Sequence, residues 1–184
     1  MVIGVLALQG SVEEHCNIVL SNCDKTILVK HPSDLNKIDA LIIPGGESTT
    51  LIRLLKIKGL DRALVEASNR GLKIWGTCAG LILLSKKILC NSFSPLGLID
   101  IVVDRNGYGS QVDSFETEID FFNNKSKVRF IRAPKIVELG SSIEVLSIYN
   151  GEPIAVRSKN IFVTSFHPEV TNNDTFYKYF KSLI

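Results

Sequence analysis

The first half of the chain alternates between apolar runs and segments in which apolar positions recur at helical spacing. Residues 2–7 are continuously apolar and partly β-branched, which is typical of a strand buried on both faces in a parallel sheet. Further strands are predicted at residues 26–29, 40–43 and 72–75, and helices at residues 11–23, 51–57, 61–69 and 81–86. This alternation predicts a doubly wound α/β core.

Polar and glycine positions mark where several of these elements begin or end. Ser11 and Glu14 stand at the spacing of a capping box, so we expect the Ser11 hydroxyl to cap the first helix. Gly71 follows the helix predicted at 61–69, and the Pro-Gly-Gly string at 44–46 breaks the strand that precedes it. The loop after the third strand is therefore an unusual connection.

After residue 98 the pattern changes to short strands joined by turns. The predicted strands are 99–103, 115–121, 128–131, 143–149, 153–157 and 161–165. Asn150 and Gly151 predict a tight hairpin turn, and residues 174–183 predict a helix with an aromatic face. No repeat or linker is visible, so we assign residues 1–184 to one domain of flavodoxin-like type, with a mostly parallel central sheet and an antiparallel elaboration.

Composition narrows the class of partner. The 184 residues are 45% hydrophobic, which is enough for a substantial core, and 21 Lys and Arg nearly balance 19 Asp and Glu. The basic residues are scattered, so no footprint for nucleic acid is visible. The apolar start lacks a basic leader, and no apolar run approaches the roughly 20 residues of a membrane span. We expect a cytoplasmic protein with no nucleic-acid or membrane partner.

The four cysteines, Cys16, Cys23, Cys78 and Cys90, form no C-x-x-C pair and no zinc-ligand spacing, which disfavours metal binding. On one helix Cys16 and Cys23 are separated by about 10 Å, which is beyond disulfide reach. We therefore expect reduced thiols, no metal and no cofactor.

Cys78 lies in a G-x-C-x-G string between a predicted strand and a predicted helix. A strained turn of this kind, a nucleophile elbow, needs small neighbours, and Gly76 and Gly80 supply them. The N-terminus of the following helix favours negative charge and hence the reactive thiolate. We predict that Cys78 is a nucleophile; an inert buried cysteine is the alternative, and it is the favoured interpretation for the other three.

The candidate general base must be one of three histidines. His15 falls in the first helix and His31 in a polar connection, and neither has a carboxylate in strand register, so we interpret both as surface or structural residues. His167 ends an apolar strand before Pro168, and Glu169 follows two residues later. In extended backbone such residues project to the same side, so Glu169 is expected to orient the His167 ring towards Cys78.

Attack on an amide carbonyl needs N–H donors for the oxyanion. The Gly-Gly-Glu-Ser-Thr segment at residues 45–49 joins a strand to a helix at the edge of the sheet where open α/β folds bind ligands. We expect the backbone N–H groups of Gly46 and Ala79 to form the hole. A phosphate-binding loop is the alternative, although neither G-x-G-x-x-G nor a G-K-[ST] lysine is present.

Together these strings resemble the class I, triad-type glutamine amidotransferases, and among them the glutaminase subunits of pyridoxal 5'-phosphate synthase, the PdxT family. The resemblance spans nearly the whole chain. Many triad glutaminases share the G-x-C-x-G and H-P-E strings, whereas A-L-Q-G, P-G-G-E-S-T, S-F-E and I-R-A-P are specific. The specific strings lie at residues 7–10, 44–49, 114–116 and 131–134, accompanied by D-R-N at 104–106 and Y-G at 108–109.

The resemblance implies that Cys78, His167 and Glu169 are a catalytic triad that hydrolyses L-glutamine to L-glutamate and ammonia through a thioester. It implies glutamine contacts for Gly46, Glu47, Ser48, Arg105, Ile131 and Arg132, and contacts with a partner subunit for Gln9 and Gly10. An arginine suits the task because a guanidinium can hold a carboxylate in two hydrogen bonds. Ser110 departs from the family pattern, in which arginine is common.

The resemblance also implies a partner, a PdxS-type synthase subunit that accepts the ammonia in a hetero-oligomer. Nearly every residue is committed to the glutaminase domain, so the acceptor is expected on another chain. Alternatives are a glutaminase for histidine or anthranilate synthesis, a catalytically silent binding subunit, and a flavodoxin-type redox sensor with one reactive cysteine.

Overall fold

A seven-stranded sheet forms the centre of the molecule. The computed structural model describes the chain apart from residues 90–92, 110–113, 123 and 172, so the predictions for Cys90 and Ser110 fall outside the described residues. The strand order is β10-β11-β12-β4-β3-β1-β2. The strands are β1 (Val2–Leu6), β2 (Lys25–Val29), β3 (Ala40–Ile43), β4 (Lys73–Thr77), β10 (Glu144–Tyr149), β11 (Glu152–Ser158) and β12 (Ile161–Thr164).

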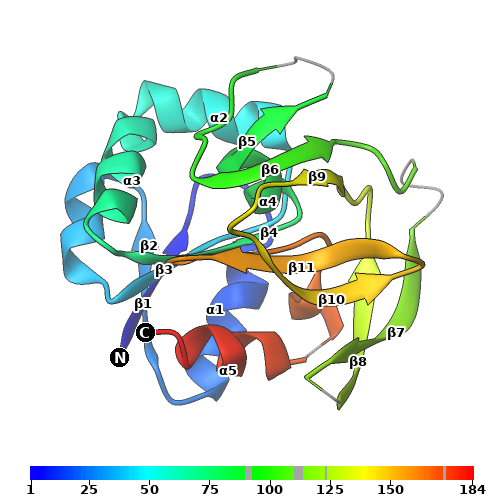
Figure 1. Ribbon diagram of the computed structural model, residues 1–184. Helices are drawn as coiled ribbons and strands as arrows, with labels where there is room; N and C mark the ends of the chain where they lie inside the picture. Colours follow the sequence, from blue (N-terminus) through cyan, green and yellow to red (C-terminus); the bar gives the residue numbers. More distant parts are fainter. Residues whose placement is uncertain (90–92, 110–113, 123, 172) are drawn as a thin grey trace.

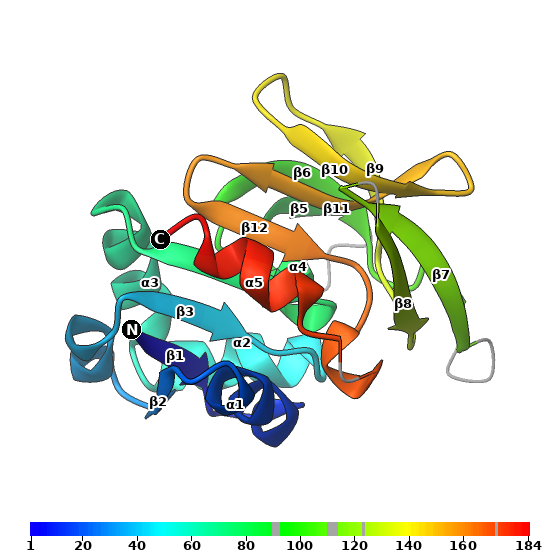
Figure 2. The same cartoon turned by 90° about the horizontal axis from the view of Figure 1, so that it is seen from below.

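The five strands from β12 to β2 are parallel, whereas β10 and β11 extend the sheet antiparallel. This confirms the predicted α/β fold with a mostly parallel sheet and an antiparallel elaboration. In Figure 2 the arrowheads of β1, β3 and β12 point the same way, so their carboxyl ends share one edge. Asn150 and Gly151 connect β10 to β11 with φ values of 50° and 80°, which confirms the predicted hairpin turn.

Helices cover both faces of this sheet (Figures 1 and 2). One face carries α1 (Val12–Ser21) and α5 (Thr175–Lys181), and the other carries α2 (Ser48–Ile57), α3 (Leu60–Asn69) and α4 (Ala79–Leu84). Strand β3 shows why its residues are all apolar: Leu41 and Ile43 pack with the α2 side, and Ala40 and Ile42 pack with the α1 side. Both faces of the strand are buried, as the continuous apolar run predicted.

Smaller elements complete the fold. A three-stranded sheet contains β5 (Ser85–Ile88), β6 (Ile99–Asp104) and β9 (Lys135–Leu139), and β7 (Phe115–Phe121) pairs with β8 (Asn124–Phe130) as a separate hairpin. Two short 3₁₀ helices, η1 (Pro32–Lys37) and η3 (Pro168–Thr171), complete the described part. Among the described residues, no helix reaches the length and hydrophobicity that crossing a bilayer requires.

Two local predictions were wrong. The predicted helix at 81–86 begins earlier and stops at Leu84, because the chain turns at Ser85 into β5, which pairs with β6. Ser11 does not cap α1 with its side chain; its hydroxyl donates instead to the Glu169 carboxylate at 2.7 Å. A hydrogen bond to an ionised carboxylate is stronger than one to a neutral backbone group, and it decides where this hydroxyl points.

Candidate active site

Cys78 occupies a strained bend between β4 and α4. Its backbone has φ 48° and ψ −101°, and its N–H donates to the Thr164 carbonyl at 2.8 Å. The flanking glycines are explained by close approaches: a Cβ on Gly80 would lie 2.2 Å from the Ile43 carbonyl oxygen, and one on Gly76 would lie 2.7 Å from Gly80. The chain therefore holds the thiol at the carboxyl edge of the sheet, as the elbow interpretation requires.

His167 is fixed by its backbone and by its ring. Its N–H donates to the Arg129 carbonyl at 2.8 Å, which joins it to the end of β8, and its Nδ1 lies 2.7 Å from Glu169 Oε1. A Cβ on Gly45 would fall 2.2 Å from the ring, so the loop after β3 presses against the imidazole. Only a glycine at position 45 leaves room for the ring in this place.

The electrostatics of His167 favour its protonated form. Burial lowers its pKa, but attraction to the Cys78 thiolate and to Glu169, together with hydrogen bonds to both, outweighs burial and raises the pKa well above the usual value. These effects bring the thiol, the imidazole and the carboxylate into one interacting group. Such a group suits nucleophilic attack followed by proton donation to a leaving group.

Glu169 reaches His167 by a route other than the predicted one. The residues are not on extended backbone, because η3 begins at Pro168, and the 3₁₀ turn brings the carboxylate back under the ring. Burial raises the pKa of Glu169, but the neighbouring His15 and His167 rings and hydrogen bonds from His167 and Ser11 lower it to about 2. The carboxylate is therefore ionised despite being buried.

His15 is a site residue that the sequence interpretation missed. It is fully buried, with Nε2 3.5 Å from Glu169 Oε2 and 3.2 Å from Thr77 Oγ1. The search for a carboxylate in strand register overlooked it, because its partner comes from the other end of the chain. A signal was present: Ser11 and His15 are one helical turn apart on the helix that follows β1, so both face the carboxyl edge of the sheet. His31, by contrast, caps η1.

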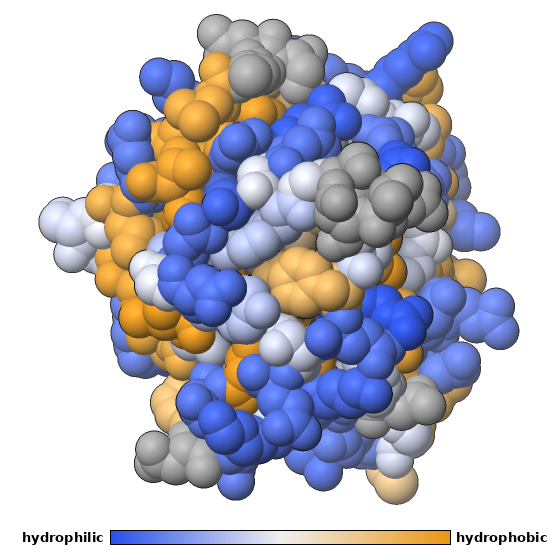
Figure 3. All heavy atoms as spheres, turned by 90° about the vertical axis from the view of Figure 1, so that its right-hand side faces the viewer, coloured by the Kyte–Doolittle hydropathy of each residue, from blue (hydrophilic) through white to orange (hydrophobic). Residues whose placement is uncertain are grey.

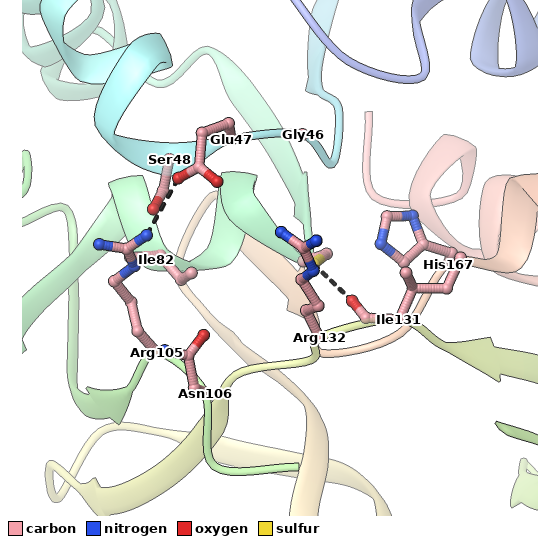
Figure 4. Close-up of a pocket in the computed structure, with 10 residues that line it drawn as sticks. Gly46, Glu47, Ser48, Ile82, Arg105, Asn106, Ile131, Arg132 and His167 are labelled. Carbon is pink, nitrogen blue, oxygen red and sulfur yellow. Dashed lines mark hydrogen bonds and ion pairs between the residues drawn. The ribbon is translucent and has the colours of Figure 1, made fainter. Parts of the chain in front are cut away.

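A pocket of about 450 Å³ opens beside Cys78. It is lined by Gly46, Glu47, Ser48, Cys78, Ile82, Arg105, Asn106, Ile131, Arg132 and His167. All six residues predicted to contact glutamine are in this lining, and Ile82 and Asn106 were not predicted. Figure 4 shows Glu47 and Arg105 pointing towards each other, with Glu47 Oε1 3.0 Å from Arg105 Nη2. The pocket therefore presents both signs of charge near the thiol.

Of the two expected oxyanion donors, Gly46 lines this pocket and Ala79 directly follows the lining residue Cys78. Ala79 is the first residue of α4, so its N–H is among those with no partner inside the helix, and Gly46 faces the pocket from the loop after β3. The Cys78 Sγ is 3.8 Å from the Ile131 carbonyl oxygen, opposite this loop. A substrate carbonyl between these walls would meet the thiol and backbone donors together.

Gln9 and Gly10 support the same loop from behind. The Gln9 side-chain oxygen accepts from the Glu47 N–H at 2.8 Å, and a Cβ on Gly10 would fall 1.8 Å from the Gly45 carbonyl oxygen. Cys16 and Cys23 carry free thiols outside the pocket. Within the described ranges, no cluster of three or more His, Cys, Asp or Glu side chains could hold a metal ion.

The molecular surface around the site is largely polar. Figure 3 looks onto the side towards which the carboxyl ends of the parallel strands point; hydrophilic atoms cover most of it, with hydrophobic atoms along one margin and a smaller hydrophobic group near the centre. A pocket with charges of both signs fits a small zwitterionic substrate.

Comparisons with known proteins agree with this geometry. The SNO glutamine amidotransferase family matches residues 5–184. Similar relatives are a pyridoxal 5'-phosphate synthase subunit PdxT of Thermotoga petrophila, 46% identical with both chains fully covered, and one of Fervidobacterium nodosum, 47% identical over all of this chain and 97% of the relative.

Solved structures give the same result for the fold. A crystal structure of a glutamine amidotransferase is 36% identical, with a TM-score of 0.95 over all of this chain and 98% of that chain. The structure of PurLQS from Thermotoga maritima contains a chain that is 18% identical, with a TM-score of 0.71 over 99% of this chain and 96% of that chain. The second likeness concerns the fold alone.

Proposed function

Because the chain belongs to the SNO glutamine amidotransferase family, we propose that it is the glutaminase subunit of a pyridoxal 5'-phosphate synthase. It hydrolyses L-glutamine to L-glutamate and ammonia. The observation that carries this proposal is the interacting group of Cys78, His167 and Glu169 at the wall of a pocket that suits an amino acid.

The proposed reaction begins with the Cys78 thiolate, which attacks the side-chain amide carbon of glutamine and forms a carbon–sulfur bond. The carbonyl oxygen becomes an oxyanion, which the N–H groups of Gly46 and Ala79 stabilise. When the intermediate collapses, the carbon–nitrogen bond breaks and protonated His167 donates its proton to the departing nitrogen. Ammonia leaves, and a γ-glutamyl thioester remains on the enzyme.

Hydrolysis of the thioester completes the cycle. The now neutral His167 accepts a proton from water, the resulting hydroxide adds to the thioester carbon, and the carbon–sulfur bond breaks. Glutamate leaves, and the thiolate and imidazolium are restored. Glu169 orients the ring in both halves, because it holds Nδ1 and so leaves the other nitrogen for proton transfer.

Substrate recognition is assigned to the charged residues of the pocket. Glu47 is proposed to meet the α-ammonium group and Arg105 the α-carboxylate of glutamine, while Gly46, Ser48, Ile131 and Arg132 complete the wall. In the unliganded protein, Glu47 and Arg105 neutralise each other. Binding of a zwitterion replaces one ion pair by two, so the exchange leaves no unpaired charge.

The ammonia is proposed to pass to a PdxS-type synthase subunit in a hetero-oligomer, with Gln9 and Gly10 at the contact. Residues 1–184 form one glutamine amidotransferase domain in this proposal, so the acceptor site is on the partner. We also propose a cytoplasmic location, which the free thiols of Cys16, Cys23 and Cys78 support.

The test is glutamine-dependent release of ammonia. The purified chain, assayed with the synthase subunit, is expected to release ammonia and glutamate in equal amounts, and Cys78→Ala is expected to lower the rate by at least about 1,000-fold because no other group can form the thioester. Cys16→Ala is the matched control and is expected to retain full activity. Ammonia release by Cys78→Ala at the wild-type rate would refute the assignment.

A further inference from the structure

The buried side chain of His15 has no part in the reaction as proposed above. It lies on α1, with none of its surface exposed, and its ring meets the edge of Trp75 at a centroid distance of 5.5 Å. It is absent from the lining of the pocket beside Cys78. A histidine in such a place is costly unless its ring nitrogens are used, so the contacts of each nitrogen decide its role.

The contacts of His15 identify its tautomer. Nε2 lies 3.5 Å from Glu169 Oε2 and 3.2 Å from Thr77 Oγ1, whereas Nδ1 has no hydrogen-bond partner in the described part of the chain. A proton on Nε2 faces a carboxylate and leaves only a lone pair unmatched. A proton on Nδ1 would leave a buried N–H unmatched and turn a lone pair towards a negative charge, which is the less stable arrangement.

The two oxygens of Glu169 have different surroundings. Oε1 receives His167 Nδ1 and the Ser11 hydroxyl, each at 2.7 Å. Oε2 is buried and, among the described residues, has no partner within hydrogen-bonding geometry; the donor that faces it is His15. At 3.5 Å this contact is long, as catalytic hydrogen bonds often are before substrate binds. His15 is thus placed to hold the side of the carboxylate that His167 does not use.

The charge of His15 is consistent with this arrangement. Burial lowers its pKa, with Glu169 and Glu14 acting in the opposite direction and His167 reinforcing the decrease. Glu169 faces it from η3, Glu14 from its own helix and His167 from the segment between β12 and η3, while β4 contributes the uncharged Trp75 and Thr77. A neutral His15 donates to Glu169 without competing as a second cation with His167.

We propose that His15 is a positioning residue: it donates from Nε2 to the second oxygen of Glu169 and so fixes the carboxylate that orients His167. The proposal rests on the function proposed above, in which His167 moves the protons. His15 also reaches the opposite wall, because the Thr77 hydroxyl that it contacts accepts from the Gly45 N–H at 2.9 Å. One ring therefore joins the triad to the loop that carries the oxyanion donor.

The experiment compares His15→Phe, which keeps a planar ring and removes the donor, with His15→Gln, whose amide nitrogen is as many bonds from the backbone as Nε2. Glutaminase kcat and KM are measured with the synthase subunit present. The pH midpoint of Cys78 alkylation by iodoacetamide, quantified on the Cys78 peptide by mass spectrometry, is measured without glutamine. Thermal unfolding reports any general loss of packing.

His15→Phe is expected to lower kcat on the order of tenfold, leave KM unchanged and raise the alkylation midpoint by at least about 0.5 pH, because a mobile Glu169 stabilises the imidazolium less well. His15→Gln is expected to have a kcat and an alkylation midpoint close to those of the wild type. A wild-type kcat and a wild-type alkylation midpoint in His15→Phe would overturn the proposal. Equal loss of kcat in both variants, with a lowered melting temperature and an unchanged alkylation midpoint, would overturn it as well.

Two further outcomes are covered. If His15→Phe does not fold, His15→Asn replaces it, since its amide is too short to reach Glu169; wild-type values in that variant would contradict the proposal, and impaired values with an intact fold would support it. If the wild-type protein releases no ammonia from glutamine, the proposed function fails, whereas the alkylation midpoint still reports whether His15 acts on Cys78 through Glu169 and His167.

Discussion

Glu169 shows how the surroundings of one side chain decide its state. A carboxylate that is almost fully buried would normally take up a proton, yet its pKa is lowered to about 2. The donors that face it are Ser11 and His15 at the N-terminal end of α1, more than 150 positions away in sequence, and His167, two residues before it. The lowered pKa is therefore a property of the folded state, and it links stability to pH.

The direction of this link follows from the two pKa values. The folded pKa of Glu169 is about 2 and the unfolded value is 4.5, so its contribution to stability is complete above about pH 4.5 and is lost as the pH falls towards 2. The wild type is expected to lose on the order of 2–3 kcal/mol relative to Glu169→Gln over this range. Urea unfolding of both proteins at several pH values measures the difference.

Salt concentration provides the control for this measurement. Surface ion pairs are screened by salt, whereas a buried carboxylate is screened much less, so the difference between the two proteins is expected to persist in about 0.5 M salt, an ionic strength with a Debye length of about 4 Å. A difference that stays constant with pH would show that Glu169 titrates alike in the folded and unfolded chains.

For single residues, the sequence was informative only where the signal came from their immediate neighbours in the chain. The bend at Cys78 was predictable because it needs small neighbours, and Gly76 and Gly80 supply them. The structure has the close approaches that explain this need, since a Cβ on either glycine would lie too near the surrounding backbone. The position of Ser11 and His15 on α1 placed both at the carboxyl edge, but their contact with Glu169, more than 150 positions away, could not be predicted. Helix rules predicted that the Ser11 oxygen accepts from a backbone N–H as a cap, whereas in the fold its hydroxyl donates to a buried carboxylate.

The loop between β3 and α2 is the element on which the two halves of the site depend. Gly45 lies against the His167 ring, while its neighbour Gly46 faces the pocket. Substitution Gly45→Ala places a methyl group where the imidazole now lies, 2.2 Å from the nearest ring carbon. The ring is expected to move, and kcat is expected to fall about 10- to 100-fold because proton transfer depends on sub-ångström placement.

A glycine outside the active-site pocket provides the matched comparison. In Gly140→Ala the added carbon would meet the side chain of Asp100, which lies exposed at the surface in an ion pair with Lys86. This variant is expected to keep kcat within about twofold of wild type. Steady-state glutaminase assays and circular dichroism distinguish a displaced ring from a general loss of structure; equal activity of the two variants would show that the loop does not position His167.

The elements were predicted best where both faces of a strand are buried. Strands β1 and β3 were recognised from unbroken apolar runs, and the structure has them within one residue of the prediction. Strands β5 and β9 were missed because each is short and has exposed positions, so neither an apolar run nor a strict alternation is present. Their pairing with β6 provides the stabilisation that their own sequences do not reveal.

The whole molecule is expected to depend on its partner. Gln9 and Gly10 support the loop that carries Glu47 and Gly46, and the same residues are proposed to contact the synthase subunit. We therefore expect docking there to act on the pocket wall. We expect weak glutaminase activity from the isolated chain and a clear increase in turnover when the synthase subunit is added, measured as glutamate formed at saturating glutamine.

Bovine serum albumin at the same concentration is the control for non-specific protection in this assay, and it is expected to leave turnover unchanged. Equal turnover with and without the synthase subunit would refute activation by the partner. It would leave the chemistry at Cys78 untouched, because Cys78→Ala tests that separately.

At Cys78, with φ 48° and ψ −101°, the residue that would stabilise the backbone best is not the one that catalysis needs. Residues other than glycine are disfavoured there by about 1–3 kcal/mol, and glycine carries no sulfur. An engineering campaign that ranked variants by heat resistance alone would therefore drift towards glycine at position 78 and deliver a sturdier, inert protein. Such a campaign has to keep cysteine at position 78 or assay turnover in every round of selection.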